Sequence, residues 1–291
     1  MKELNSGKVL SAHPIDPAIR QRVLRALADI EAEHDVTVLY ACESGSRGWG
    51  FASQDSDYDV RFLYVHRLPW YLAVEPKRDV IELPISDELD VGGWELRKAL
   101  RLLRRANPVL LEWLDSPVVY QQNKDFTAQI RAMIPHWFSE RRGRYHYLAM
   151  ANRNFRGYLQ GERVRLKKYL YVLRPLLAAQ WIERGLGRPP MRFADLVERL
   201  VTDPALFAEI NELLAIKMQA NEAEYSPRWP HIHSFIESEL MKNVVDADYK
   251  NPEGDAAELD AFLMQTVLAM PGVNQEGSCS GSGEFIDLKS K

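Results

Sequence analysis

Cysteine and long apolar runs are both scarce in this 291-residue sequence. Its two cysteines, Cys42 and Cys279, lie far apart and outside any C-x-x-C spacing, which excludes a disulfide framework and a zinc knuckle. The most apolar stretch, residues 169–182, is too short to span a bilayer and carries Arg174 in its middle. The first residues contain no apolar core of the kind that a secretory signal needs. We therefore expect a water-soluble, cytoplasmic protein without a membrane partner.

The net charge of −4 is unevenly distributed along the chain. Residues 97–174 hold 17 Lys and Arg against five Asp and Glu, whereas the remainder holds 20 against 36. A local positive excess of this size attracts a phosphate-rich partner such as RNA, but it also suits a solvated helical surface balanced by neighbouring acids. Charge alone leaves these two interpretations open.

Hydrophobic periodicity predicts an α+β protein in which a small mixed β-sheet precedes an α-helical region. The expected strands cover residues 37–41, 59–65, 70–74, 80–83 and 89–91. The expected helices cover residues 17–33, a segment beginning at residue 94, and residues 108–113, 137–160, 163–184, 193–200, 204–225 and 228–243. We expect two domains, over residues 1–120 and 121–272. Residues 273–291 are rich in Gly and Ser and are expected to form a flexible or vector-derived tail.

A glycine-rich turn followed by two acids is the most informative segment. Asp57 and Asp59 are two residues apart at the start of an expected strand, so their side chains project from the same face. Two adjacent carboxylates repel, and a divalent cation such as Mg²⁺ between them relieves the repulsion, although a pair of solvated acids is the alternative. In the preceding turn, Gly45 lets the backbone approach a ligand closely, Ser46 offers a hydroxyl and Arg47 offers charge for phosphate oxygens.

This segment resembles the DNA polymerase β nucleotidyltransferase superfamily, whose motif is an apolar strand, Gly-Ser, about ten residues, and acid-x-acid on the next strand. It looks most like the nucleotidyltransferase family associated with RNA repair pathways, with which it shares GSR-x-x-G and SD-x-D elements. The likeness covers most of residues 36–184. It implies that residues 1–120 form a nucleotidyltransferase catalytic domain and that residues 121–272 line its cleft. The implied cofactors are two Mg²⁺ ions, with Mn²⁺ as the alternative, held by Asp57 and Asp59.

The superfamily adds a third carboxylate from a later strand. Asp90 is the preferred candidate because it lies between apolar neighbours just before an expected helix, and Glu82 is the competitor. Asp90 would complete the metal site and help to deprotonate the incoming hydroxyl. The resemblance also implies that the helix opened by Lys168 and Tyr169 lines the cleft and contacts the triphosphate.

The implied reaction transfers a nucleoside monophosphate from a nucleoside triphosphate such as ATP to a hydroxyl acceptor and releases pyrophosphate. An RNA 3′ end, a tRNA in particular, is the preferred acceptor because residues 97–174 are basic. A side-chain hydroxyl of a partner protein or a small molecule would need the same metal site, so the sequence leaves the acceptor open. A non-catalytic nucleotide sensor is the remaining alternative, although binding alone would not require clustered carboxylates.

Overall fold

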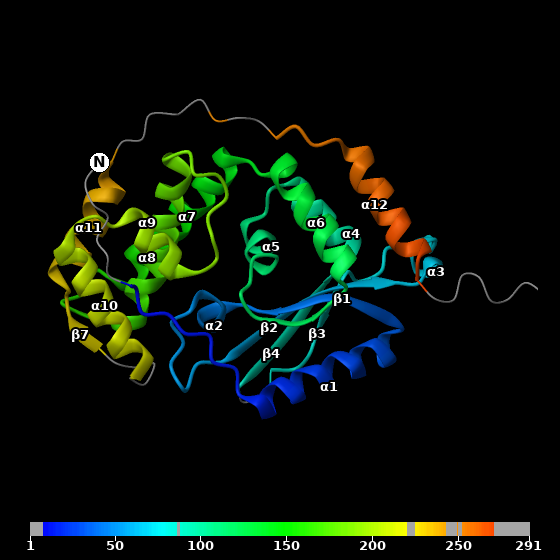
Figure 1. Ribbon diagram of the computed structural model, residues 1–291, viewed down its shortest axis with the longest axis horizontal. Coiled ribbons are helices and arrows are strands. Elements are labelled where there is room, and N and C mark those ends of the chain that lie inside the picture. The colour runs from blue at the N-terminus through cyan, green and yellow to red at the C-terminus, as the bar shows by residue number, and fades with distance from the viewer. Residues whose placement is uncertain (1–7, 86–87, 220–224, 243–248, 250–251, 271–291) are drawn as a thin grey trace, which may run out of the picture.

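The computed structural model describes residues 8–85, 88–219, 225–242, 249 and 252–270. Its first half contains a β-sheet with helices on both faces, and its second half is almost entirely helical (Figure 1). The first half contains α1 Pro17–His34, β1 Val36–Glu43, α2 Gly45–Trp49, β2 Tyr58–His66, α3 Leu68–Tyr71, β3 Val80–Glu82, β4 Leu89–Glu95, α4 Leu96–Arg104, α5 Pro108–Trp113, β5 Val119–Gln122 and α6 Lys124–Trp137. The second half contains α7 Glu140–Tyr158, β6 Arg163–Arg165, α8 Leu166–Glu183, α9 Phe193–Leu200, α10 Pro204–Gln219, β7 Tyr225–Pro227, α11 Pro230–Met241 and α12 Ala256–Leu268. The predicted α+β fold class is confirmed.

The five-stranded sheet has the order β3-β4-β2-β1-β5 and is mixed. Strands β2 and β4 run parallel, with Asp59 opposite Asp90, whereas β1 runs antiparallel to β2. The amino ends of β2 and β4 and the carboxyl end of β1 therefore meet at the same end of the sheet. This topology brings the glycine-rich turn after β1 to the two acids.

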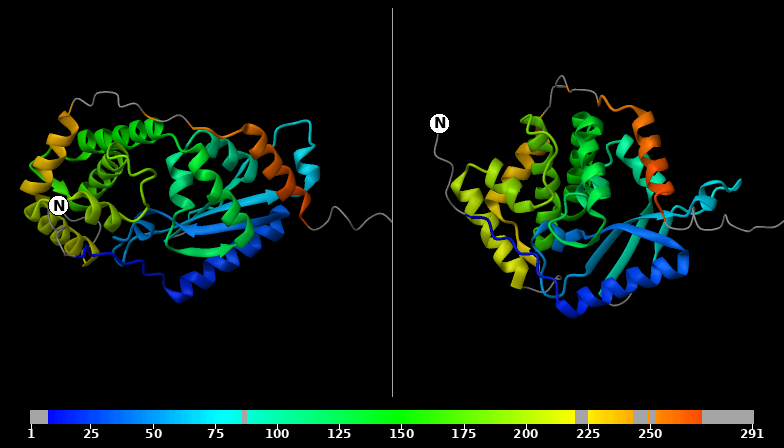
Figure 2. Two further views of the ribbon diagram at one scale, coloured as in Figure 1. Left: turned by 45° about the horizontal axis from the view of Figure 1, so that its top comes forward. Right: turned by 45° about the vertical axis from the view of Figure 1, so that its right-hand side comes forward.

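Each face of the sheet is covered by a separate set of apolar side chains. Helix α1 packs Val23, Leu27 and Ile30 against one face, and α4, α5 and α6 cover the other (Figures 1 and 2). Alternation along β2 sends Val60 to the α1 side and Leu63 to the opposite side. The acids and the glycine-rich turn at the amino ends of β2 and β4 are thus supported by apolar cores on both faces of the sheet.

The helical half is built around α8, whose residues are buried along most of its length. Helix α7 packs along α8, and α9, α10 and α11 surround the pair (Figure 2). Within the described residues, no helix is both long enough and apolar enough to cross a membrane.

Several predicted elements differ from the structure. The predicted strand over residues 70–74 is wrong, because residues 68–71 form the short helix α3 with a proline in its first turn. Strand β5 and helices α6 and α12 were not predicted. Both α6 and α12 pack against the sheet-facing core, so this core draws residues from both ends of the helical half, and the expected boundary at residue 120 stays a prediction. The predicted tail over residues 273–291 lies outside the described residues.

Candidate active site

The carboxylate of Asp59 lies directly against the start of α2. The Ser44 amide donates to the Asp59 carbonyl oxygen at 2.8 Å, which joins the end of β1 to β2. Gly45 follows with a left-handed φ of 56°, and a Cβ on this residue would lie 1.9 Å from Asp59 Oδ2. Only glycine tolerates both the backbone angle and the close approach. The turn and the acid therefore form one packed unit, as the sequence pattern suggested.

Arg61 links the two acids that the strand register pairs. Its Nη2 donates to Asp59 Oδ1 at 3.0 Å and to Asp90 Oδ2 at 2.6 Å. Alternation along β2 places Arg61 on the same face as Asp59, so the spacing in the sequence already implies that the two side chains are neighbours. Within the described part of the chain, no three His, Cys, Asp or Glu side chains are grouped so as to hold a metal ion.

The charges of two neighbouring acids act on the Asp59 carboxyl. Burial raises the pKa of Asp59, and the negative charges of Asp90 and Asp57 raise it further, while Arg61 lowers it. Asp57 itself is exposed and precedes β2. The competing carboxylate, Glu82, lies on β3 opposite Gly92, one strand beyond Asp90, and pairs with Arg78 at 2.7 Å. The register thus brings Asp90, and not Glu82, directly beside Asp59.

A fourth acid, Glu43, supports this arrangement from the end of β1. Its side chain is fully buried, accepts from the Asp59 amide at 2.8 Å and accepts from the Tyr120 hydroxyl at 2.5 Å. Burial raises the pKa of Glu43 to about 7, against the effect of these two donors. Glu43 fixes the backbone at Asp59. Sequence reasoning missed it because nothing in the motif required an acid there.

Similarity to known proteins identifies the family of this chain. The RNA repair pathway DNA polymerase beta family matches residues 19–265. The chain belongs to this family. It is also 47% identical, over 86% of its length and 96% of the relative's, to a Bacillus subtilis (strain 168) protein named "Uncharacterized protein YcgL". A solved nucleotidyltransferase-like protein from Exiguobacterium sibiricum 255-15 shares 15% identity at a TM-score of 0.29, covering 86% of this chain and 76% of that chain.

The Arg47 side chain points away from the phosphate-binding turn, toward the loop before β2. Its guanidinium donates to the carbonyl oxygens of Pro14, Gln54, Ser56 and Asp57 and stacks 3.7 Å from the centre of the Tyr58 ring. The side chain is only 3% exposed. We therefore revise the expected phosphate contact, because these carbonyl bonds give Arg47 the role of holding the loop before β2. Gly45 and Ser46 remain the phosphate-binding candidates.

The predicted pair on α8 is split by the fold. Lys168 places its Nζ 3.9 Å from the centre of the Tyr158 ring and 5.2 Å from that of Tyr171. The ring of Tyr171 in turn meets Trp49 of α2 edge-on at 5.6 Å, so Lys168 lies on the side of α8 toward the turn. Tyr169 is fully buried in the helical core, where its hydroxyl lies 3.3 Å from His233 Nδ1. Tyr169 is therefore a packing residue, and only Lys168 stays a candidate.

A buried ion pair that the sequence did not reveal fastens α2 to the helical half. Glu112 on α5 accepts from Arg174 Nη1 and from the Tyr147 hydroxyl, both at 3.0 Å, and from Trp49 Nε1 at 3.4 Å. The Arg174 guanidinium also lies over the Trp49 ring at 4.6 Å. These contacts set the distance between α8 and the candidate phosphate turn.

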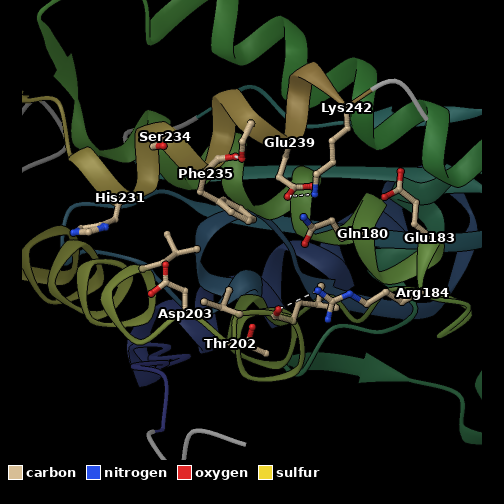
Figure 3. Close-up of a pocket in the computed structure, with 14 residues that line it drawn as sticks. Gln180, Glu183, Arg184, Thr202, Asp203, His231, Ser234, Phe235, Glu239 and Lys242 are labelled. Carbon is tan, nitrogen blue, oxygen red and sulfur yellow. Dashed lines mark hydrogen bonds and ion pairs between the residues drawn. The ribbon is translucent and has the colours of Figure 1, made fainter. Parts of the chain in front are cut away.

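A separate hollow of about 430 Å³ lies among α8, the loop before α10, and α11 (Figure 3). Side chains of both charge signs line it, and two of its cations have partners there: Lys242 pairs with Glu239, and Arg184 donates to the Leu200 carbonyl oxygen at 3.3 Å. The hollow shares no lining residue with the acid cluster. It is therefore not part of the candidate active site.

Proposed function

We propose that the protein transfers a nucleoside monophosphate from a nucleoside triphosphate to a hydroxyl group of RNA. The supporting observation is the register that sets Asp59 beside Asp90 with the Asp59 carboxylate packed against Gly45. Phosphoryl-group transfer needs clustered negative ligands for cations next to a place for phosphate oxygens. This end of the sheet combines the acids with the turn.

The acids fit divalent cations by their chemistry. Asp57, Asp59 and Asp90 offer oxygen ligands, and one nitrogen of Arg61 bridges the carboxylates of Asp59 and Asp90. They would hold Mg²⁺ or Mn²⁺, which supplies charge stabilisation at the attacking and leaving oxygens. Because Arg61 binds both Asp59 and Asp90, its side chain must release them when a cation takes their oxygens.

The residues then divide the transfer step among them. Gly45 and Ser46 hold the terminal phosphates, and Asp90 accepts the proton of the attacking hydroxyl. A bond forms between the acceptor oxygen and the α-phosphorus while the bond to the pyrophosphate oxygen breaks. Lys168 contributes positive charge from the facing helix.

Unpaired arginines on α4 support RNA as the acceptor. Many cations of residues 97–174 are engaged, for example Arg144 with Glu183 and Lys98 with Asp79. In the described part of the chain, no carboxylate pairs with Arg101, Arg104 or the cap residue Arg105, whereas the Arg97 guanidinium lies 4.9 Å from the centre of the Tyr71 ring. A row of unpaired arginines at helical spacing suits a phosphate backbone.

The decisive experiment supplies each labelled nucleoside triphosphate and Mg²⁺ with either total small RNA or a protein extract. Label on RNA that is absent from Asp57→Ala/Asp59→Ala supports the proposal. Asp29→Ala/Glu33→Ala, which removes two exposed acids from α1, should label RNA as the wild type does. Label on protein bands alone would move the acceptor to a side-chain hydroxyl. The absence of any label would favour a nucleotide sensor.

A salt titration tests the α4 arginines separately from catalysis. Removing two phosphate contacts with Arg101→Ala/Arg104→Ala should weaken RNA binding and lower the slope of log Kd against log salt by about two. Arg25→Ala/Arg199→Ala removes the same charge from exposed positions elsewhere and should leave the slope unchanged. Equal slopes in all three proteins would contradict the assignment of α4 to RNA.

A further inference from the structure

A pocket of about 470 Å³ opens immediately beside Asp90, on the β3–β4 side of the sheet. Arg61 and Asp90 line it at one end, Trp94 and Trp113 at the other, and Glu82 along β3. Its size is within the range of pockets that take small organic ligands. None of the residues assigned to the triphosphate lines it.

Gly92 lines the pocket, and the packing around it would accept a larger residue. A Cβ on Gly92 would meet its nearest atoms, Glu82 Cγ and Arg61 Nη1, at 3.8 and 3.9 Å, which is ordinary contact. The neighbouring Gly93 differs, because a Cβ there would lie 2.3 Å from the Phe62 ring. Gly93 is therefore needed for packing, whereas Gly92 leaves a slot open.

Strand register places this slot between an acid and an aromatic ring. Asp90, Gly92 and Trp94 alternate onto the same face of β4, so Gly92 lies about 7 Å from each of its two neighbours on that face. The Trp94 ring stacks on Trp113 at 3.8 Å with an interplanar angle of 26°. This stack holds the indole of Trp94 in place as one wall of the slot.

The order of the strands separates this pocket from the triphosphate turn. The turn follows β1, Asp57 directly precedes β2, Asp59 lies on β2, and the pocket lies beyond Asp90 on β4. A nucleotide bound at the turn and a group bound in the pocket would approach the acids from opposite sides. We propose that the pocket binds the terminal nucleoside of the acceptor RNA, its base against Trp94 and its ribose hydroxyl at Asp90.

This inference rests on the proposed function and adds recognition of the acceptor's last base. Stacking of one base on an aromatic side chain strengthens binding by about tenfold or more. An RNA that lacks only its terminal base should therefore bind about tenfold more weakly, while its phosphate contacts stay the same.

The test measures the affinity of a short single-stranded RNA and of the same RNA with an abasic 3′ terminal ribose. The wild type should prefer the complete RNA, and Gly92→Val, which fills the slot, should bind both equally. Valine suits an extended strand, so the variant should unfold at a temperature no lower than the wild type's. Gly157→Val is the matched control, because a Cβ at that helical glycine meets nothing within 4 Å, and it should keep the preference. Gly92→Ala, a smaller filling, should reduce the preference in part.

Other outcomes overturn the assignment in distinguishable ways. If the wild type labels RNA yet binds both RNAs equally, or if Gly92→Val keeps the preference, the pocket does not hold the base although the proposed function stands. If Gly92→Val raises the KM for the triphosphate and not for RNA, the pocket belongs to the nucleotide donor. If RNA is neither bound nor labelled, the proposed function fails as well.

Discussion

Replacing Gly45 with alanine tests whether the turn and the acid act as one unit. The left-handed φ of 56° costs a residue with a Cβ about 1–2 kcal/mol of folding free energy. The larger effect is local, because the new Cβ would lie 1.9 Å from Asp59 Oδ2 and the carboxylate would have to move by more than about 1 Å to reach van der Waals distance. A displacement of that size at a catalytic group lowers a rate by about 100-fold. We therefore expect Gly45→Ala to stay folded and to lose at least that much transfer activity.

Gly50→Ala separates the backbone cost from the displacement of the acid. Gly50 also has a left-handed φ, of 96°, and a Cβ there would lie 2.4 Å from Ser11 Oγ, away from the carboxylates. Denaturant unfolding should give similar losses of stability for the two variants, and single-turnover transfer should fall only in Gly45→Ala. A Gly45→Ala protein that transfers label at the wild-type rate would refute the claim that Asp59 must lie against the turn.

Three further predictions concern charges in and near the site. Arg61→Met should bind Mn²⁺ several-fold more tightly, because the acids no longer need to release the guanidinium; weaker binding in paramagnetic resonance titrations would contradict this. The pKa of Glu43 rises on folding from 4.5 to about 7, so the folded state holds the proton longer and stability should fall as pH rises through that window. Glu43→Gln should lack this fall in denaturant titrations at several pH values. Glu112→Ala should cost about 3–5 kcal/mol of unfolding free energy, because it leaves Arg174 buried and unpaired, and a loss below 1 kcal/mol would count against the ion pair.

The sequence was sufficient for the fold class and the position of the turn, because both depend on local patterns. Alternation marked β2, and short runs bounded by Gly, Pro or charged residues marked β1, β3 and β4. The run of Gly and Ser after residue 43 marked the turn. The bounding residues misled at residues 70–74, where aromatic residues that suggested a strand form the short helix α3 and the chain after it. Strand β5, over residues 119–122, coincides with the domain boundary that we expected near residue 120 and was therefore missed.

The site itself was readable only in part. The spacing of Asp57 and Asp59 predicts a shared face, but which later acid joins them depends on the pairing of β2 with β4, which is a tertiary fact. The same limitation applies to Arg47 and Tyr169. Their residue types suit phosphate contact, yet carbonyl oxygens surround Arg47 and the helical core surrounds Tyr169. Sequence identifies a chemical group, and packing decides which way it points.

The loop that carries Asp57 shows why the catalytic half depends on the helical half. Within the catalytic half, Arg47 donates to the carbonyl oxygens of Gln54 and Ser56 in this loop. From the helical half, Lys217 of α10 donates to Ser53 Oγ at 2.5 Å, and Ser53 Oγ lies 2.9 Å from Ser56 Oγ. Lys217 is only 3% exposed, so this contact is a buried anchor and not a surface pairing. Because the anchor comes from the second half of the chain, a fragment that ends after the sheet would lack this support of the loop that carries Asp57. Such a fragment should therefore lose transfer activity even where its sheet still folds.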